Sequence, residues 1–185
     1  MKTWRITLAW LVLLVAGAGL LRADTSPEYK LKAAYLFNFT KFVDWPTNAF
    51  ADAKAVMVIG VLGEDPFGNS LEEIVQNRTI NGRSLAIQRV RRVEELKNCQ
   101  LLFISRSEQS HLKSILAGLD GRPVLTVSDA DDFLDNGGTI SLVLDGRNIR
   151  FEINAGTAER AGLKIDAQLL SLAKTVRPAN PRRTD

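Results

Sequence analysis

The residue types that most often carry out catalysis are rare in this 185-residue chain, which has one histidine, His111, and one cysteine, Cys99. A serine or cysteine nucleophile needs a base within reach, and that base is usually a histidine. His111 lies in a stretch whose apolar residues have helical spacing, which is typical of a surface residue on a helix. The chain contains no Gly-x-Ser-x-Gly or His-Glu-x-x-His pattern. The sequence therefore predicts a protein that is not an enzyme, without catalytic residues and without a cofactor.

A cluster of acidic residues is the next candidate for chemistry, because hard cations bind several carboxylate oxygens. The cluster consists of Asp129, Asp131, Asp132 and Asp135. It lacks the glycine and the terminal glutamate that an EF-hand loop needs at fixed positions, and the cap and first turn of a short helix would hold the same acids. One cysteine and one histidine are too few for a structural zinc site. We therefore expect no metal site.

The loop 63–68 is a candidate ligand site, because it follows an apolar run and precedes a helix that Asn69 or Ser70 would cap. In an open α/β sheet, small ligands bind beyond the carboxyl end of a strand and at the start of a helix. The candidate ligand-binding residues are Gly63, Glu64, Asp65 and Asn69. The loop lacks the Gly-rich dinucleotide pattern and the phosphate-loop lysine, and its two acids would repel a phosphate. A turn followed by a helix cap is the alternative interpretation.

Alternating apolar runs and helical patterns predict the elements that would position these residues. Residues 55–62 form a continuous apolar run, typical of a strand buried on both faces of a parallel sheet. Asn81-Gly82 indicates a turn, and Gly121 a helix end. Further strands are predicted at 85–90, 101–105 and 124–127, and helices at 69–75, at 107–119 after a Ser107 cap, and at 129–136.

The last third of the chain predicts a hairpin followed by two helices. Residues 140–144 and 149–153 flank Asp145-Gly146, a hairpin signal. The second strand alternates apolar and charged residues, which favours an edge position with one wet face. A helix over 155–161 would stop at Gly162, and a last helix would run from Asp166 to Pro178. The apolar stripe of that last helix is Leu169, Leu172, Ala173 and Val176.

These elements predict an α/β fold: a single three-layer Rossmann-like domain with a mostly parallel sheet, an antiparallel edge hairpin, and N- and C-terminal helices packed on it. Residues 24–177 form this domain, and 178–185 a disordered tail. Residues 1–23 are typical of a cleaved signal peptide, with Lys2 and Arg5 before an apolar run and Ala23 at the cleavage site. Leu21 is larger than the ideal residue there, which leaves an uncleaved membrane anchor open.

Charge gives no support for nucleic-acid binding. The whole chain has 24 basic and 21 acidic residues. Lys2, Arg5 and Arg22 lie within the first 23 residues, which hold no acid, so the remaining chain has 21 residues of each sign.

Cys99 leads into an apolar run, which favours a buried, inert thiol. A disulfide to another chain is the alternative, because a single thiol cannot form an internal one.

The segment 28–46 is predicted to be a long amphipathic helix that starts after Ser26 and Pro27 and ends near Trp45, before Pro46. Its core-facing arc would consist of Leu31, Tyr35, Leu36, Phe39, Phe42 and Val43. Phe37 projects to the opposite, polar side. Either a second element, such as the C-terminal helix, covers Phe37, or the ring is exposed and binds a partner. On the second interpretation, Phe37, Lys41 and Trp45 are candidate partner-binding residues.

The chain carries, in this order, KAAYLFNFTKFVDWP (32–46), CQLLFIS (99–105), VLTVSD (124–129), NGGTI (136–140), RFEIN (150–154) and a segment from AGL (161–163) to LLSLA (169–173). Together these six segments resemble the YfiR family of periplasmic regulatory proteins, and they extend over nearly all of the chain after residue 23. Some members carry paired cysteines. This chain does not, which puts redox control through a disulfide in doubt.

The resemblance implies a homodimeric periplasmic regulator that restrains an inner-membrane diguanylate cyclase, or a sensor kinase, through that enzyme's periplasmic domain. Such a regulator would lower cyclic-di-GMP signalling and biofilm formation. The alternative is a periplasmic small-ligand sensor that uses the loops 63–68 and 128–136. Both can hold at once, because a ligand can change the affinity of a regulator for its partner.

Overall fold

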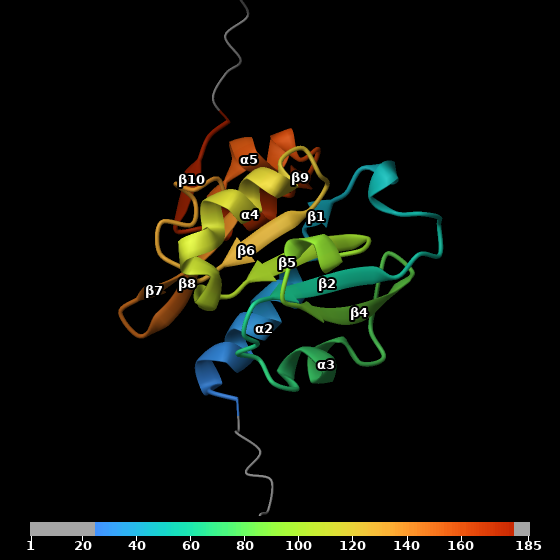
Figure 1. Ribbon diagram of the computed structural model, residues 1–185, viewed down its shortest axis with the longest axis horizontal. Helices are drawn as coiled ribbons and strands as arrows, with labels where there is room; N and C mark the ends of the chain where they lie inside the picture. Colours follow the sequence, from blue (N-terminus) through green and yellow to red (C-terminus); the bar gives the residue numbers. More distant parts are fainter. Residues whose placement is uncertain (1–24, 180–185) are drawn as a thin grey trace, which may run out of the picture.

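The computed structural model describes residues 25–179, which form an α/β domain on one eight-stranded sheet (Figure 1). In spatial order the strands are β10 (Thr175–Arg177), β8 (Asn148–Asn154), β7 (Ile140–Asp145), β6 (Leu125–Ser128), β5 (Cys99–Ile104), β2 (Met57–Leu62), β4 (Arg83–Val90) and β3 (Thr79–Ile80). Neighbouring strands from β7 to β4 are parallel, whereas β8 is antiparallel to β7 and β3 to β4. This confirms the predicted α/β class with its mostly parallel sheet and its hairpin.

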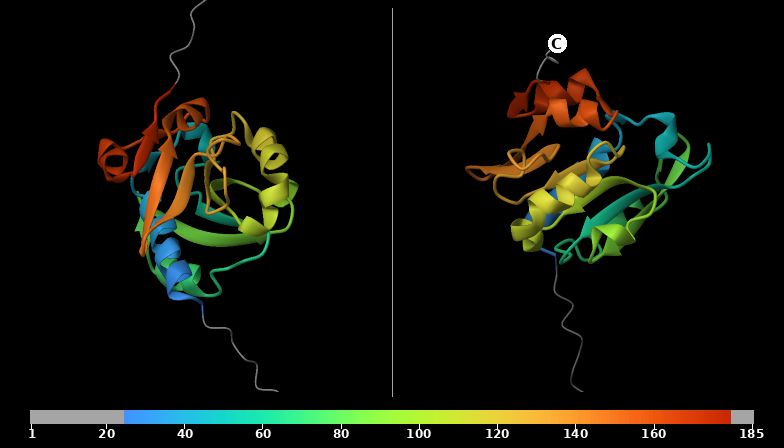
Figure 2. Two further views of the ribbon diagram at one scale, coloured as in Figure 1. Left: turned by 90° about the vertical axis from the view of Figure 1, so that its left-hand side faces the viewer. Right: turned by 45° about the horizontal axis from the view of Figure 1, so that its top comes forward.

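Helices cover both faces of this sheet, and Figure 2 shows α2 and α4 on opposite sides of it. The α-helices are α2 (Pro27–Phe39), α3 (Ser70–Val75), α4 (Leu112–Leu119), α5 (Ala155–Arg160) and α6 (Ala167–Leu172). Three short 3-10 helices are η1 (Thr47–Ala49), η2 (Val93–Glu95) and η3 (Arg106–His111). A separate small ribbon pairs β1 (Val43–Asp44) with β9 (Lys164–Ile165) in antiparallel fashion.

Successive side chains of the central strands point to opposite faces of the sheet, which divides the core between these two faces. In β5, Leu101 and Phe103 pack in the cluster that contains α2, α3 and α6 residues. Leu102 and Ile104 point to the other side, where they pack with α4. Because all four side chains are fully buried, β5 is covered on both faces, as its continuous apolar run predicts.

Helix α2 begins where the sequence predicts and ends six residues earlier than expected. The Ser26 hydroxyl caps it by accepting a hydrogen bond from the Tyr29 backbone N–H, with Pro27 at the first helical position. The helix ends at Phe39, and residues 40–42 turn the chain into β1, whose pairing with β9 requires an extended backbone. The predicted end near Trp45 is therefore wrong, because a tertiary strand pairing overrides the local helical pattern.

The expected core-facing arc of α2 is also wrong in part. Leu31 is 48% exposed, whereas Lys32 and Phe37 are buried. Phe37 is covered because α3 packs on α2 beside the sheet, and the cationic groups of Lys41 and Arg78 lie 4.3 and 4.9 Å from the ring centroid. An exposed Phe37 ring, the premise of the partner-binding interpretation, is therefore wrong. The ring belongs to the core.

The C-terminal segment departs from its predicted helix. Asp166 caps α6 as expected, but the helix ends at Leu172, and residues 175–177 form β10. Leu172 is exposed, so the expected apolar stripe does not exist over its full length. β10 pairs in parallel with β8, which places β8 inside the sheet and corrects its predicted edge position.

Residues 131–137 form a succession of turns, which corrects the helix predicted over 129–136. Asp132 has a φ of +53°, a left-handed conformation that interrupts a right-handed helix. At the start of the α4 segment, the Ser105 hydroxyl caps η3, and Ser107, the predicted cap, supplies the N–H that it accepts.

No helix within residues 25–179 has the length and apolar character needed to cross a lipid bilayer.

Candidate functional site

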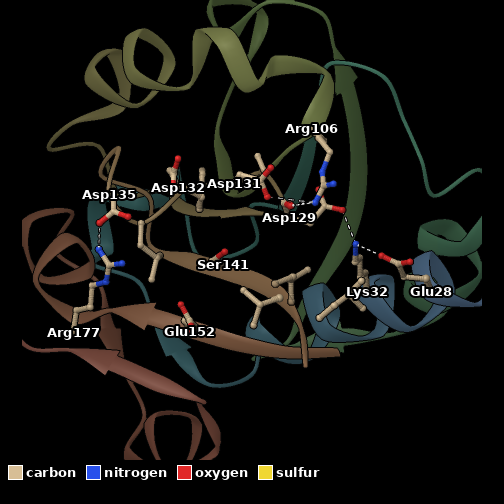
Figure 3. A pocket seen from close by; sticks show the side chains of 16 residues that line it. Glu28, Lys32, Arg106, Asp129, Asp131, Asp132, Asp135, Ser141, Glu152 and Arg177 are labelled. Carbon is tan, nitrogen blue, oxygen red and sulfur yellow. Dashed lines mark hydrogen bonds and ion pairs between the residues drawn. The ribbon is translucent and has the colours of Figure 1, made fainter. Parts of the chain in front are cut away.

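A cavity of about 650 Å³ lies over the β7–β8 end of the sheet, under the loop that follows β6 (Figure 3). The loop 129–135 forms one wall, and Ser141 and Glu152 of β7 and β8 lie opposite it. Glu28 and Lys32 of α2 close one end, and Arg177 of β10 closes the other. The cavity thus lies beside the carboxyl end of a parallel strand, where open α/β sheets bind small ligands.

A row of polar side chains crosses the sheet beside this cavity. Strand register aligns Ser128 with Ser141, Ser141 with Glu152, and Glu152 with Thr175, and aligned residues of neighbouring strands point to the same face. The loop 129–137, rather than a helix, covers this part of the face, because α4 packs over β5 and β6. The cavity therefore has a polar floor at the end of an otherwise apolar sheet.

A buried ion pair holds the α2 end of the cavity. Lys32 Nζ lies 2.5 Å from Asp129 Oδ2, and the side chains are 4% and 3% exposed. Lys32 Nζ also lies 2.5 Å from Glu28 Oε1, one helical turn earlier. Taking two charges out of water is costly unless they are paired and hydrogen-bonded, so this pair needs its additional partners.

Tyr29 and Arg106 supply further hydrogen bonds to Asp129. The Tyr29 hydroxyl donates to Asp129 Oδ2 at 2.8 Å, and Arg106 Nη2 donates to the Asp129 carbonyl at 2.6 Å. Burial, together with the hydrogen bond to Asp129, raises the pKa of the Tyr29 hydroxyl, which keeps it protonated as a donor. Asp129 Oδ1 is buried and has no hydrogen-bond partner among the described residues. One carboxylate oxygen therefore keeps its full capacity to accept.

A second ion pair lies at the other end of the cavity. Arg177 Nη1 donates to Asp135 Oδ1 at 2.6 Å, which joins β10 to the loop after β6. This hydrogen bond lowers the pKa of the Asp135 carboxyl below its ordinary value. Unlike the Lys32–Asp129 pair, both side chains are substantially exposed, so a ligand could compete for either of them.

The predicted ligand loop 63–68 does not line this cavity, and two of its polar groups already have partners within the protein. The Glu64 backbone N–H donates to Ser107 Oγ, and Asp65 accepts from the Phe67 N–H and from Arg89 Nε. Gly63 has a φ of +90°, and a Cβ there would come 2.5 Å from Ser107 Oγ. These contacts match the turn of the turn-and-cap alternative, whereas Asn69, the N-cap residue of α3, makes no side-chain capping hydrogen bond. Ligand binding by Gly63, Glu64, Asp65 and Asn69 stays a prediction.

The two other candidate partner residues lie at the end of α2 and beyond it. Lys41 is exposed, with Nζ 3.3 Å from Asn38 Oδ1 as well as over the Phe37 ring. Trp45 is half-buried, and its indole N–H donates to the Gln100 carbonyl. Partner binding at Lys41 and Trp45 stays a prediction.

Cys99 is buried, as predicted, and its thiol donates to the Leu101 carbonyl at 3.0 Å. Burial raises the pKa of the Cys99 thiol to about 12, so the reactive thiolate is scarce at neutral pH. His111 is exposed at the end of η3, also as predicted. Within residues 25–179, no group of three or more His, Cys, Asp or Glu side chains is arranged to hold a metal ion.

Sequence reasoning named the acids of the 129–135 loop but missed Lys32, Tyr29, Arg106, Glu152 and Arg177 as their neighbours. Lys32 and Asp129 are 97 positions apart, so no local pattern links them. One signal was available: a lysine at Lys32, on the side of the helix that carries Leu36 and Phe39, is unusual unless a buried carboxylate meets it.

Residues 29–174 match the model of a protein family described as YfiR/HmsC-like. The match extends over most of the chain. The chain belongs to the YfiR/HmsC-like family. The resemblance seen in the six sequence segments is thereby confirmed, and the Lys32–Asp129 pair lies within the matched range.

Two solved structures are similar to this family member. One is the ABC domain from Streptococcus pneumonia in complex with L-Trp, with a TM-score of 0.51 and 15% identity, covering 78% of this chain and 60% of that one. The chain therefore spans less than two thirds of that protein. The other is a conserved domain protein from Vibrio cholerae O1 biovar El Tor, with a TM-score of 0.46 and 14% identity, covering 65% and 55%. At these identities the first likeness shows the fold alone, and the second carries no argument.

Proposed function

We propose that the protein is a periplasmic regulator that binds an inner-membrane signalling enzyme, a diguanylate cyclase, and restrains it, so lowering cyclic-di-GMP levels and biofilm formation. Membership of the YfiR/HmsC-like family over residues 29–174 carries this proposal. On this proposal the protein is regulatory rather than catalytic. It is exported with cleavage of residues 1–23, and it works as a homodimer. A sensor kinase with a periplasmic domain is the alternative partner.

The exposed surface at the end of α2 is the proposed partner contact. Lys41 is exposed and packs on the buried Phe37 ring, which holds its charge in a defined place. Trp45 is half-buried, and aromatic residues of this kind are enriched at interfaces. Phe37 would then act from within the core by supporting Lys41, rather than by contacting the partner directly.

The test is to co-express the chain with the membrane cyclase encoded nearest to its gene, and to measure cyclic-di-GMP and capture by the cyclase's periplasmic domain. We expect lower cyclic-di-GMP and a stable complex. We expect Lys41→Glu to weaken capture, whereas Lys113→Glu, an exposed lysine on the opposite face, leaves it unchanged. Unchanged cyclic-di-GMP with no complex would refute the regulatory function. Equal capture of both variants would refute only the proposed contact surface.

A second function, ligand sensing, is favoured by the cavity beside Lys32 and Asp129. It has the volume of a small-molecule site, and its lining combines apolar residues with charged groups from separate elements. A molecule that binds only the folded protein raises its melting temperature, and the stabilisation grows with the logarithm of the ratio of ligand concentration to Kd. A thermal-shift screen of small polar metabolites is the general test of this function.

A further inference from the structure

We propose that the cavity between the loop 129–137 and the strands β7 and β8 binds a small organic cation of the alkyl diamine class, held by Asp132, Glu152 and Asp129. This inference deepens the ligand-sensing function proposed above and rests on it. It names the chemical class of the ligand and the groups that recognise it.

The charge of the lining is the first argument. Six carboxylates and three cationic side chains line the cavity, so its formal charge is −3. The carboxylates are Glu28, Asp129, Asp131, Asp132, Asp135 and Glu152, and the cations are Lys32, Arg106 and Arg177. A concave site lined by an excess of one sign attracts ligands of the opposite sign. The cavity therefore favours a cation and disfavours phosphates and dicarboxylates.

The pairing of these charges shows which carboxylates are available. Lys32 lies between Glu28 and Asp129, and Arg177 pairs with Asp135. Arg106 reaches the Asp129 carbonyl and lies 4.0 Å from Asp131. Asp132 and Glu152 have no cationic side chain within ion-pair distance among the residues described here. Glu152 accepts a long hydrogen bond, 3.5 Å, from Thr175 Oγ1, but no cation neutralises either carboxylate within the described chain.

The orphaned oxygen of Asp129 is an independent argument. Asp129 lines the cavity, its side chain is 97% buried, and Oδ1 accepts no hydrogen bond within the described chain. A buried acceptor of a charged group that lacks a donor costs about 1 to 3 kcal/mol or more. An ammonium group carries three donors and no acceptor, so an ammonium that displaces the atoms covering Oδ1 would supply the donor that this oxygen lacks.

The positions of the carboxylates in the cavity favour a diamine as the ligand. Figure 3 shows Asp132 and Glu152 on opposite sides of the cavity, with Ser141 between them. Val143, Leu144 and Phe133 contribute apolar surface to the lining. A linear diamine has an ammonium at each end, which matches two separated carboxylates, and its methylenes can pack on the apolar residues of the lining. The volume of about 650 Å³ far exceeds that of a single metal ion.

The test uses the full mature chain and isothermal titration with putrescine, cadaverine and spermidine, at 0.15 M NaCl. n-Butylamine, 1,4-butanediol and succinate are the matched probes with one ammonium, no charge and negative charge. We expect saturable binding of the diamines, weaker binding of n-butylamine, and no binding of butanediol or succinate. Because each hydrogen-bonded charge contributes about 1.5 to 3 kcal/mol, losing one ammonium should weaken binding by about tenfold or more.

Three substitutions that each replace a carboxylate by a neutral amide of similar size locate the site. Glu152→Gln and Asp132→Asn each remove a free carboxylate without removing bulk, and we expect each to weaken putrescine binding by about tenfold. Glu94→Gln is the control, since Glu94 is exposed on η2 and does not line the cavity. Unchanged melting of the ligand-free variants verifies that they fold.

The proposal would be overturned by no binding of any diamine, or by equal loss of binding in Glu94→Gln and the cavity variants. Preference for succinate over putrescine would also overturn it. If the thermal-shift screen identifies a ligand of another chemical class and no diamine binds, the ligand-sensing function is supported and only the diamine proposal is refuted. Diamine binding with unchanged cyclic-di-GMP and no complex in the co-expression test would support the site while refuting the regulatory function.

Discussion

Lys32 is the residue whose surroundings reveal most about this fold, because a lysine is almost never fully buried without partners. It lies on α2, and its ammonium meets Asp129 and Glu28 while packing 4.4 Å from the Tyr29 ring centroid. The sequence showed Asp129 as a first-turn acid of a helix that does not form. The partner of Asp129 could not be predicted, because only the packing of α2 against the end of β6 brings these residues together.

The buried pair makes a sharp prediction for single substitutions. Lys32→Met leaves the Asp129 carboxylate buried without its cation, so we expect a loss of about 3 to 5 kcal/mol in the free energy of unfolding. Urea denaturation followed by circular dichroism measures it. We expect the double variant Lys32→Met/Asp129→Asn to lose clearly less, because it leaves no unpaired charge. Additive losses in the double variant would mean that the two residues are not coupled.

At the scale of elements, the starts of α2 and α6 were predicted better than their ends. Ser26 and Asp166 cap α2 and α6 through local hydrogen bonds, which a sequence pattern records directly. The ends at Phe39 and Leu172 depend on the strands that follow, β1 and β10, and these strands exist only because distant segments pair with them. A local pattern contains no information about such partners.

Phe37 tests the corrected orientation of α2. The ring is 4% exposed and lies in the core cluster, so we expect Phe37→Ala to destabilise the domain by about 3 to 5 kcal/mol. Lys41→Ala, which removes only an exposed cation over the same ring, should lose no more than about 1 kcal/mol. Thermal and urea unfolding compare the two. If Phe37→Ala barely changes stability but abolishes partner capture, the interpretation of Phe37 as an interface residue is restored.

For the whole molecule, the continuous apolar runs predicted the layered α/β domain and the buried parallel strands. They could not predict β10, because Thr175-Val-Arg177 is only three residues long. The residues of the candidate site likewise divide into those that the sequence indicated and those that only the fold brings to the cavity. The acids of the loop after β6 were visible in sequence, whereas Glu28, Glu152 and Arg177 reach the cavity only through the order of the strands.

Strand β10, at the edge of the sheet, is expected to contribute measurably to stability. A chain that ends at Ala173 loses β10, the Lys174 N–H bond to the Phe151 carbonyl and the Arg177–Asp135 pair. We expect it to lose about 1 to 3 kcal/mol and to self-associate, because β8 becomes an unprotected edge. Urea unfolding and size-exclusion chromatography measure both effects. A chain that ends at Ala179 keeps every one of these contacts and is the control. Equal behaviour of the two truncations would show that β10 does not protect the sheet.

The position of Arg177 and Asp129 along the chain also imposes an order on biogenesis. Helix α2 emerges first from a ribosome or a translocation channel, yet its Lys32 has no carboxylate partner across the sheet until Asp129 follows. The far wall of the cavity arrives only with Arg177, near the end of the described chain. A nascent chain therefore presents an incompletely satisfied, partly apolar helix throughout its passage, and we expect that helix to be the segment that holding chaperones recognise.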